Sequence, residues 1–135
     1  RRVFSADNQR ILALVGSLFG ILGGLSLIGV GLTPADLYLE IHAVCATWLF
    51  RFFFIASICY SIVIFRHDQF ENRFMGGYLV FTFSILLYIL VSEWGPDPKI
   101  NQFALILQVI SQKIIILIFM VSIYIQTLGI KKLQK

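Results

Sequence analysis

The chain has 135 residues, of which 59% are hydrophobic and 13% charged, with a mean hydropathy of +0.88 and a formal net charge of +4. Soluble domains carry about a quarter of their residues as charged side chains, so this composition excludes an ordinary soluble domain. The positive charge does not indicate nucleic-acid binding, because the basic residues lie at the ends of apolar segments, as they do in membrane proteins. The sequence therefore predicts an integral membrane protein with no nucleic-acid partner.

Four apolar segments occupy nearly the whole chain and predict an all-α, transmembrane helical bundle. A helix of roughly 20 apolar residues crosses the hydrocarbon core of a bilayer. The predicted spans are 11–32, 40–65, 74–92 and 102–129. They leave no room for a separate soluble domain, so residues 1–135 are interpreted as a single transmembrane domain.

The first predicted span contains a stripe of glycines at Gly16, Gly20 and Gly24, with further glycines nearby. Small residues at a spacing of four let a second helix approach closely in a membrane. We expect this stripe to pack against another transmembrane helix, either within the chain or in a second copy of it.

The second predicted span contains a full charge, Arg51, well inside its apolar run. An Arg at the centre of a span costs about 2.5–3.5 kcal/mol or more, so its guanidinium needs a partner or a route to water. The two cysteines, Cys45 and Cys59, lie in the same span and are interpreted as small apolar packing residues.

The basic residues alternate between the two sides of the predicted spans. The segment 33–40 contains no Lys or Arg, and the turn after the third span contains only Lys99. Cytoplasmic loops of membrane proteins are enriched in Lys and Arg. Both termini are therefore expected to face the cytoplasm, on the side of Arg1, Arg2, Arg10, Arg66, Arg73, Lys131, Lys132 and Lys135.

Polar side chains of several spans are expected to gather on the opposite side of the membrane. Counting 1.5 Å per residue places Arg51 roughly 22 Å and Lys113 roughly 27 Å above the cytoplasmic boundary. His42 and Glu93 are expected near that level. One interpretation is structural, with the cations reaching the interface or pairing with carboxylates. The other is a pocket for the anionic head group of a lipid, because ionisable residues within membranes often mark functional sites.

Other chemistries lack the residues that they require. No metal site is expected without clustered His, Cys and carboxylates. No haem is expected, because His42 and His67 are predicted on opposite faces of the membrane, and no other cofactor is indicated. A thiol exchanger would need a reactive cysteine pair, and a proton antiporter would need a carboxylate within a span. We therefore expect no enzymatic activity, with His42 near Glu93 as the one candidate base.

Two stretches of the chain share a pattern with a known family. In GVGLTPADLYLEIHAVCATWLFRF, a Gly-rich span ends in a Pro turn, and a His and an aromatic-rich helix follow. The closing stretch, QKIIILIFMVSIYIQTLGIKK, begins at Gln112. The pattern resembles the DRAM/Frag-like superfamily of membrane proteins, in its prokaryotic branch of unknown function, at Gly31, Pro34, His42, Trp48 and Phe50.

This resemblance implies further expectations. Family members typically have six spans, so these four would be the last four of a longer chain. It implies a prokaryotic cytoplasmic membrane, a relation to lipids in some eukaryotic relatives, and no catalytic residues.

Two functions remain open from the sequence. The first is a structural or accessory subunit that packs against partner helices in a hetero- or homo-oligomer. The second is a lipid-binding or lipid-translocating protein that uses the membrane-embedded cations. Membrane lipids and other transmembrane helices are the expected partners.

Overall fold

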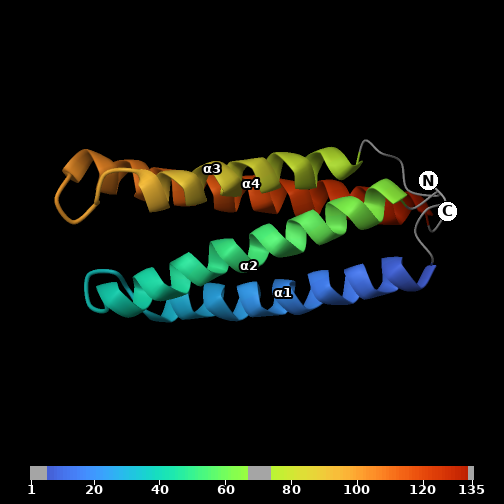
Figure 1. Cartoon of the computed structure of the whole chain (residues 1–135), viewed down its shortest axis with the longest axis horizontal. Coiled ribbons are helices and arrows are strands. Elements are labelled where there is room, and N and C mark those ends of the chain that lie inside the picture. Colours follow the sequence, from blue (N-terminus) through green and yellow to red (C-terminus); the bar gives the residue numbers. More distant parts are fainter. Residues whose placement is uncertain (1–5, 67–73, 134–135) are drawn as a thin grey trace. The chain divides into compact units, whose positions relative to one another are not determined.

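A computed structural model of the chain describes residues 6–66 and 74–133, with side chains described for 8–66 and 74–129. The regular structure of these residues is helical (Figure 1). All four helices are long and apolar enough to cross a membrane. This confirms the prediction of an all-α protein with four spans. The helices are α1 (Ala6–Leu32), α2 (Leu39–Arg66), α3 (Met75–Trp94) and α4 (Gln102–Leu133).

The chain forms two compact units, which we call the N-terminal unit (Arg1–Val63) and the C-terminal unit (Ile64–Lys135). The N-terminal unit pairs α1 with α2, and the C-terminal unit pairs α3 with α4 (Figure 1). The expected cytoplasmic location of both termini stays a prediction. Four of the basic residues on which it depends lie outside the described residues, namely Arg1, Arg2, Arg73 and Lys135.

In the N-terminal unit, α1 and α2 contact each other along most of their length. The Ser17 and Tyr60 hydroxyls are 2.8 Å apart. The rings of Phe19 and Phe52 have their centroids 5.9 Å apart. In these pairs the residue numbers add up to about 75, as in an antiparallel helix pair of constant register.

The turn between α1 and α2 is set by Pro34. Proline has no backbone N–H and disfavours a helical conformation in the residue before it, so α1 ends at Leu32. The Pro34 carbonyl accepts hydrogen bonds from the N–H groups of Leu37 and Tyr38, at 3.1 and 2.9 Å. The chain thus reverses within the six residues between the two helices.

In the C-terminal unit, polar and aromatic side chains join α3 to α4. The Ser122 hydroxyl donates to the Gly77 carbonyl at 2.8 Å. The Phe81 and Phe119 rings have centroids 5.0 Å apart. The residue numbers of these pairs add up to about 200, again the pattern of an antiparallel pair.

This register shows how α3 and α4 match a bilayer. The 20 residues of α3 are about 30 Å long, which is close to the thickness of the hydrocarbon core. The register places Trp94, at the end of α3, level with Ile106 of α4. The first turn of α4 therefore lies beyond the end of α3, as expected from its length.

The turn between α3 and α4 depends on Gly95 and Asn101. A Cβ atom at Gly95 would lie 2.2 Å from the Val91 carbonyl oxygen, so only glycine fits at the end of α3. The Asn101 side chain caps α4, because its Oδ1 accepts from the N–H of Phe103 at 2.9 Å and of Ala104 at 3.3 Å.

Candidate functional site

Three glycines of α1 let this helix approach α2 closely. A Cβ atom at Gly16 would lie 3.0 Å from Cys59 Cβ. At Gly23 it would lie 2.6 Å from Phe53 Cδ1, and at Gly29 it would lie 2.7 Å from the Cys45 sulfur. The absence of a side chain thus favours close contact with α2 at all three positions, and the contact is tightest at Gly23, where several atoms of the Phe53 ring are near.

The other two glycines of the predicted stripe lie on a different part of α1. A Cβ atom at Gly20 or Gly24 would meet nothing within 4 Å among the described residues. The stripe is thus divided: Gly16 packs within the chain, whereas the packing of Gly20 and Gly24 stays a prediction. The spacing of four residues predicts that the three glycines of the stripe share one face of α1. The glycines that approach α2 include Gly16 and Gly23, which are seven residues apart.

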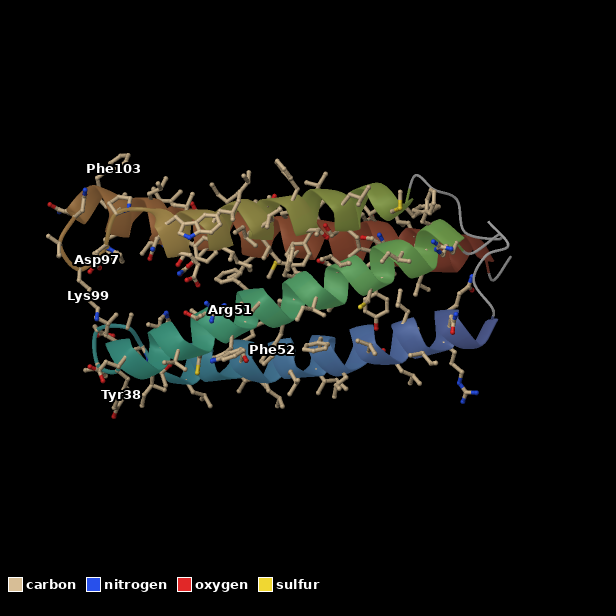
Figure 2. All side chains as sticks on the ribbon, viewed as in Figure 1. Tyr38, Arg51, Phe52, Asp97, Lys99 and Phe103 are labelled. Atoms are coloured by element: carbon tan, nitrogen blue, oxygen red, sulfur yellow. The ribbon has the colours of Figure 1, made fainter. Side chains whose placement is uncertain are left out.

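Arg51 of α2 lies against aromatic side chains of the N-terminal unit. Its guanidinium carbon is 5.6 Å from the centroid of the Trp48 ring. Trp48 stacks on Phe52 with centroids 5.3 Å apart, and Phe52 contacts Phe19 of α1. Figure 2 shows Arg51 and Phe52 side by side on α2. The cation–π contact contributes about 0.5–2 kcal/mol, which offsets only part of the cost of an Arg in a membrane.

His42 joins the first turn of α2 to the end of α1. Its Nδ1 is 2.6 Å from the Thr33 carbonyl oxygen, and the ring is half-buried. Because a carbonyl only accepts, Nδ1 is the donor in this contact. Of the predicted head-group residues, His42 therefore has an evident structural role in the N-terminal unit.

Glu93 and Lys113, the other two predicted head-group residues, are exposed in the C-terminal unit. The register of α3 and α4 places Glu93 level with Leu107 and Lys113 level with Leu87. The two charges thus differ by about 9 Å along the helix axis, and Lys113 is the deeper one relative to Trp94. A site formed jointly by His42, Arg51, Glu93 and Lys113 stays a prediction.

A polar network in the C-terminal unit was missed by the sequence analysis. The Gln112 amide donates to the Tyr88 hydroxyl at 2.7 Å, and the Tyr88 hydroxyl is also hydrogen-bonded to Ser92. Further along α4, the Gln126 amide donates to the Phe74 carbonyl. The available signal was the spacing of four between Ser84, Tyr88 and Ser92, which places three hydroxyls on one face of α3.

Residues that could bind a metal do not cluster in the described part of the chain. No group of three or more His, Cys, Asp or Glu side chains occurs among residues 8–66 and 74–129. Cys45 and Cys59 are free and lie along one helix.

The four apolar helices define the class of the chain, an all-helical membrane protein. No family model matches the chain, and no curated protein or solved structure matches it. The resemblance to the DRAM/Frag-like superfamily therefore stays a prediction.

Proposed function

We propose that the chain is a non-catalytic accessory subunit of a larger membrane assembly, in which α1 packs against a transmembrane helix of a partner. The observation that supports this proposal is the division of the α1 glycines. Those that approach α2 are explained by close packing, but Gly20 and Gly24 have no neighbour within 4 Å among the described residues.

A glycine within a helix is unfavourable without a packing reason. It costs about 0.5–1 kcal/mol relative to alanine. In lipid, two small residues at a spacing of four allow backbones to approach closely and stabilise helix pairs by van der Waals packing. A partner helix seated on Gly20 and Gly24 would supply that reason.

The test replaces Gly20 by Leu in the full chain and measures the size of the assembly solubilised from its own membrane. We expect the chain to leave the assembly, because the added side chain holds the partner helix away. The matched control is Leu25→Phe, which adds bulk to α1 at a position that is 59% exposed and on another side of the helix. An unchanged assembly in Gly20→Leu would refute the proposal. The size of the purified wild-type chain on its own then shows whether the partner is a second copy of this chain.

A lipid-binding or lipid-translocating function is the second candidate, and the placement of Arg51 favours it. A guanidinium held against an aromatic ring suits recognition of a phosphate group. Retention of phosphatidylglycerol by the purified chain, measured by native mass spectrometry, tests this function. Loss of retention in Arg51→Leu and Lys113→Leu would support it, and retention equal to wild type would refute it.

A further inference from the structure

A groove of about 240 Å³ lies on the C-terminal unit between α3 and α4. One part of its lining is polar and comes from Ser84, Tyr88, Gln108 and Ser111. The other part is aliphatic and includes Ile114, Ile115 and Ile118. Clefts that are mainly apolar with a few convergent polar groups are typical ligand sites.

The groove follows the membrane normal, with Gln108 near one end and Ile118 at the other. Ser84 also lines its deeper part, but the Ser84 hydroxyl is already used, because it donates to the Val80 carbonyl at 2.8 Å. With Trp94 taken as the level of one boundary, the register places Gln108 about 3 Å and Ile118 about 18 Å below it. One leaflet of the hydrocarbon core is about 15 Å thick. The groove therefore runs from the interface to the middle of the bilayer. Figure 2 marks the turn at this end of α3 and α4 by Asp97, Lys99 and Phe103.

The polar groups at this end differ in how far they are already engaged. The Tyr88 hydroxyl is held by Gln112 and Ser92. The half-buried Gln108 amide has no hydrogen-bond partner among the described residues. An amide that lies near the interface without a protein partner can form hydrogen bonds to a polar group from outside the chain.

We propose that this groove binds one diacyl glycerolipid from the leaflet on the Trp94 side. The Gln108 amide donates a hydrogen bond to an ester carbonyl of the lipid, which lies close to the interface. One acyl chain then follows the aliphatic side chains from Ile114 to Ile118. This site involves neither the α1 glycines nor Arg51, so it is independent of both functions proposed above.

A second groove on the same helix pair shows why the first is distinctive. It has a volume of about 430 Å³ and includes Gly77, Val121 and Ser122. Its hydroxyl group is already used, because Ser122 donates to the Gly77 carbonyl. Without a free polar group at one end, this second groove offers no contact to an ester group and serves as an internal comparison.

The experiment compares two lipids on the purified full chain by native mass spectrometry. The probes are dioleoyl phosphatidylcholine and its diether analogue, which has the same chains and head group but no ester carbonyl. We expect the wild-type chain to retain the diester lipid roughly three- to tenfold better, the range of one net hydrogen bond. In Gln108→Leu this preference should disappear. Equal retention of both lipids by the wild-type chain would overturn the proposal without any variant.

A pair of matched variants tests the groove itself. Ser111→Phe fills the proposed site, whereas Val121→Phe adds a ring to the second groove. We expect the first variant to lose retention of the diester lipid and the second to keep it. Circular dichroism and size-exclusion chromatography show that each variant is folded. Equal effects of the two variants would overturn the assignment of the lipid to this groove.

Discussion

The division of the α1 glycines leads to a quantitative prediction for two alanine variants of one helix. Gly23→Ala places a methyl group 2.6 Å from Cδ1 and 2.7 Å from Cε1 of the Phe53 ring. Gly20→Ala places the same methyl group where no described residue lies within 4 Å. The two variants share the backbone effect of exchanging Gly for Ala, so their difference isolates the contact with α2.

The size of this difference follows from packing. Inserting a methyl group into a close contact between helices costs about 1–3 kcal/mol. Replacing Gly by Ala in a helix contributes about 0.5–1 kcal/mol in the opposite direction. We therefore expect Gly20→Ala to be neutral or stabilising. Gly23→Ala should be less stable than Gly20→Ala by about 1–3 kcal/mol.

Unfolding of the purified chain by SDS in mixed micelles, followed by circular dichroism, measures both variants. Phe53→Leu provides the second test, because removing the ring should relieve the strain of Gly23→Ala. The double variant should then recover much of the lost free energy of unfolding. Equal stability of Gly20→Ala and Gly23→Ala would show that α1 and α2 do not pack through Gly23.

Three further substitutions test separate contacts. Arg51→Leu should leave the free energy of unfolding unchanged or raise it, because the cost of a membrane-embedded charge exceeds the stabilisation from the Trp48 contact. SDS unfolding measures this, and a large loss of stability would contradict it. Tyr88→Phe should cost about 0.6–1.7 kcal/mol through the Gln112 hydrogen bond, and a double-mutant cycle with Gln112→Leu checks the coupling. Asn101→Ala should cost about 0.5–2 kcal/mol at the start of α4, and Asn101→Asp, as the control, should retain most of the stability.

The four spans could be predicted from the sequence because each depends on a single property along the chain. A run of about 20 apolar residues fixes a helix in lipid, where the backbone polar groups have no other partners. The ends follow from equally local signals, such as Pro34 after α1 and Asn101 before α4. Tertiary contacts were not needed for either inference.

The role of each glycine could not be predicted in the same way. The repeat of Gly16, Gly20 and Gly24 identifies a face of α1 but not the helix that covers it. That choice depends on side chains of α2, since the Phe53 ring requires a glycine opposite it at Gly23. A spacing rule within one helix contains no information about such a partner.

The depths of the polar side chains in the membrane could be predicted only approximately, because the sequence does not give the register between two helices. Counting residues from the nearest cytoplasmic charge gives a depth for one helix at a time. The packing of α3 on α4 adds the register between them, which separates Glu93 from Lys113 by about 9 Å. It also brings Tyr88 and Gln112 together, although they are 24 residues apart in the sequence. Pairs of this kind only become visible once two helices are aligned.

The two ends of the C-terminal unit use their polar side chains differently, and this difference indicates where a ligand enters. Away from Trp94, Ser122 and Gln126 are buried and donate to the backbone carbonyls of Gly77 in α3 and of Phe74 just before it. Their hydrogen bonds therefore hold the two helices together. Toward Trp94, Gln112 and Tyr88 also join the two helices, whereas Gln108 and Ser111 line an open groove and are half-buried. A polar group that is not needed for packing is available to a lipid or a partner, so recognition by this unit should occur from the Trp94 side.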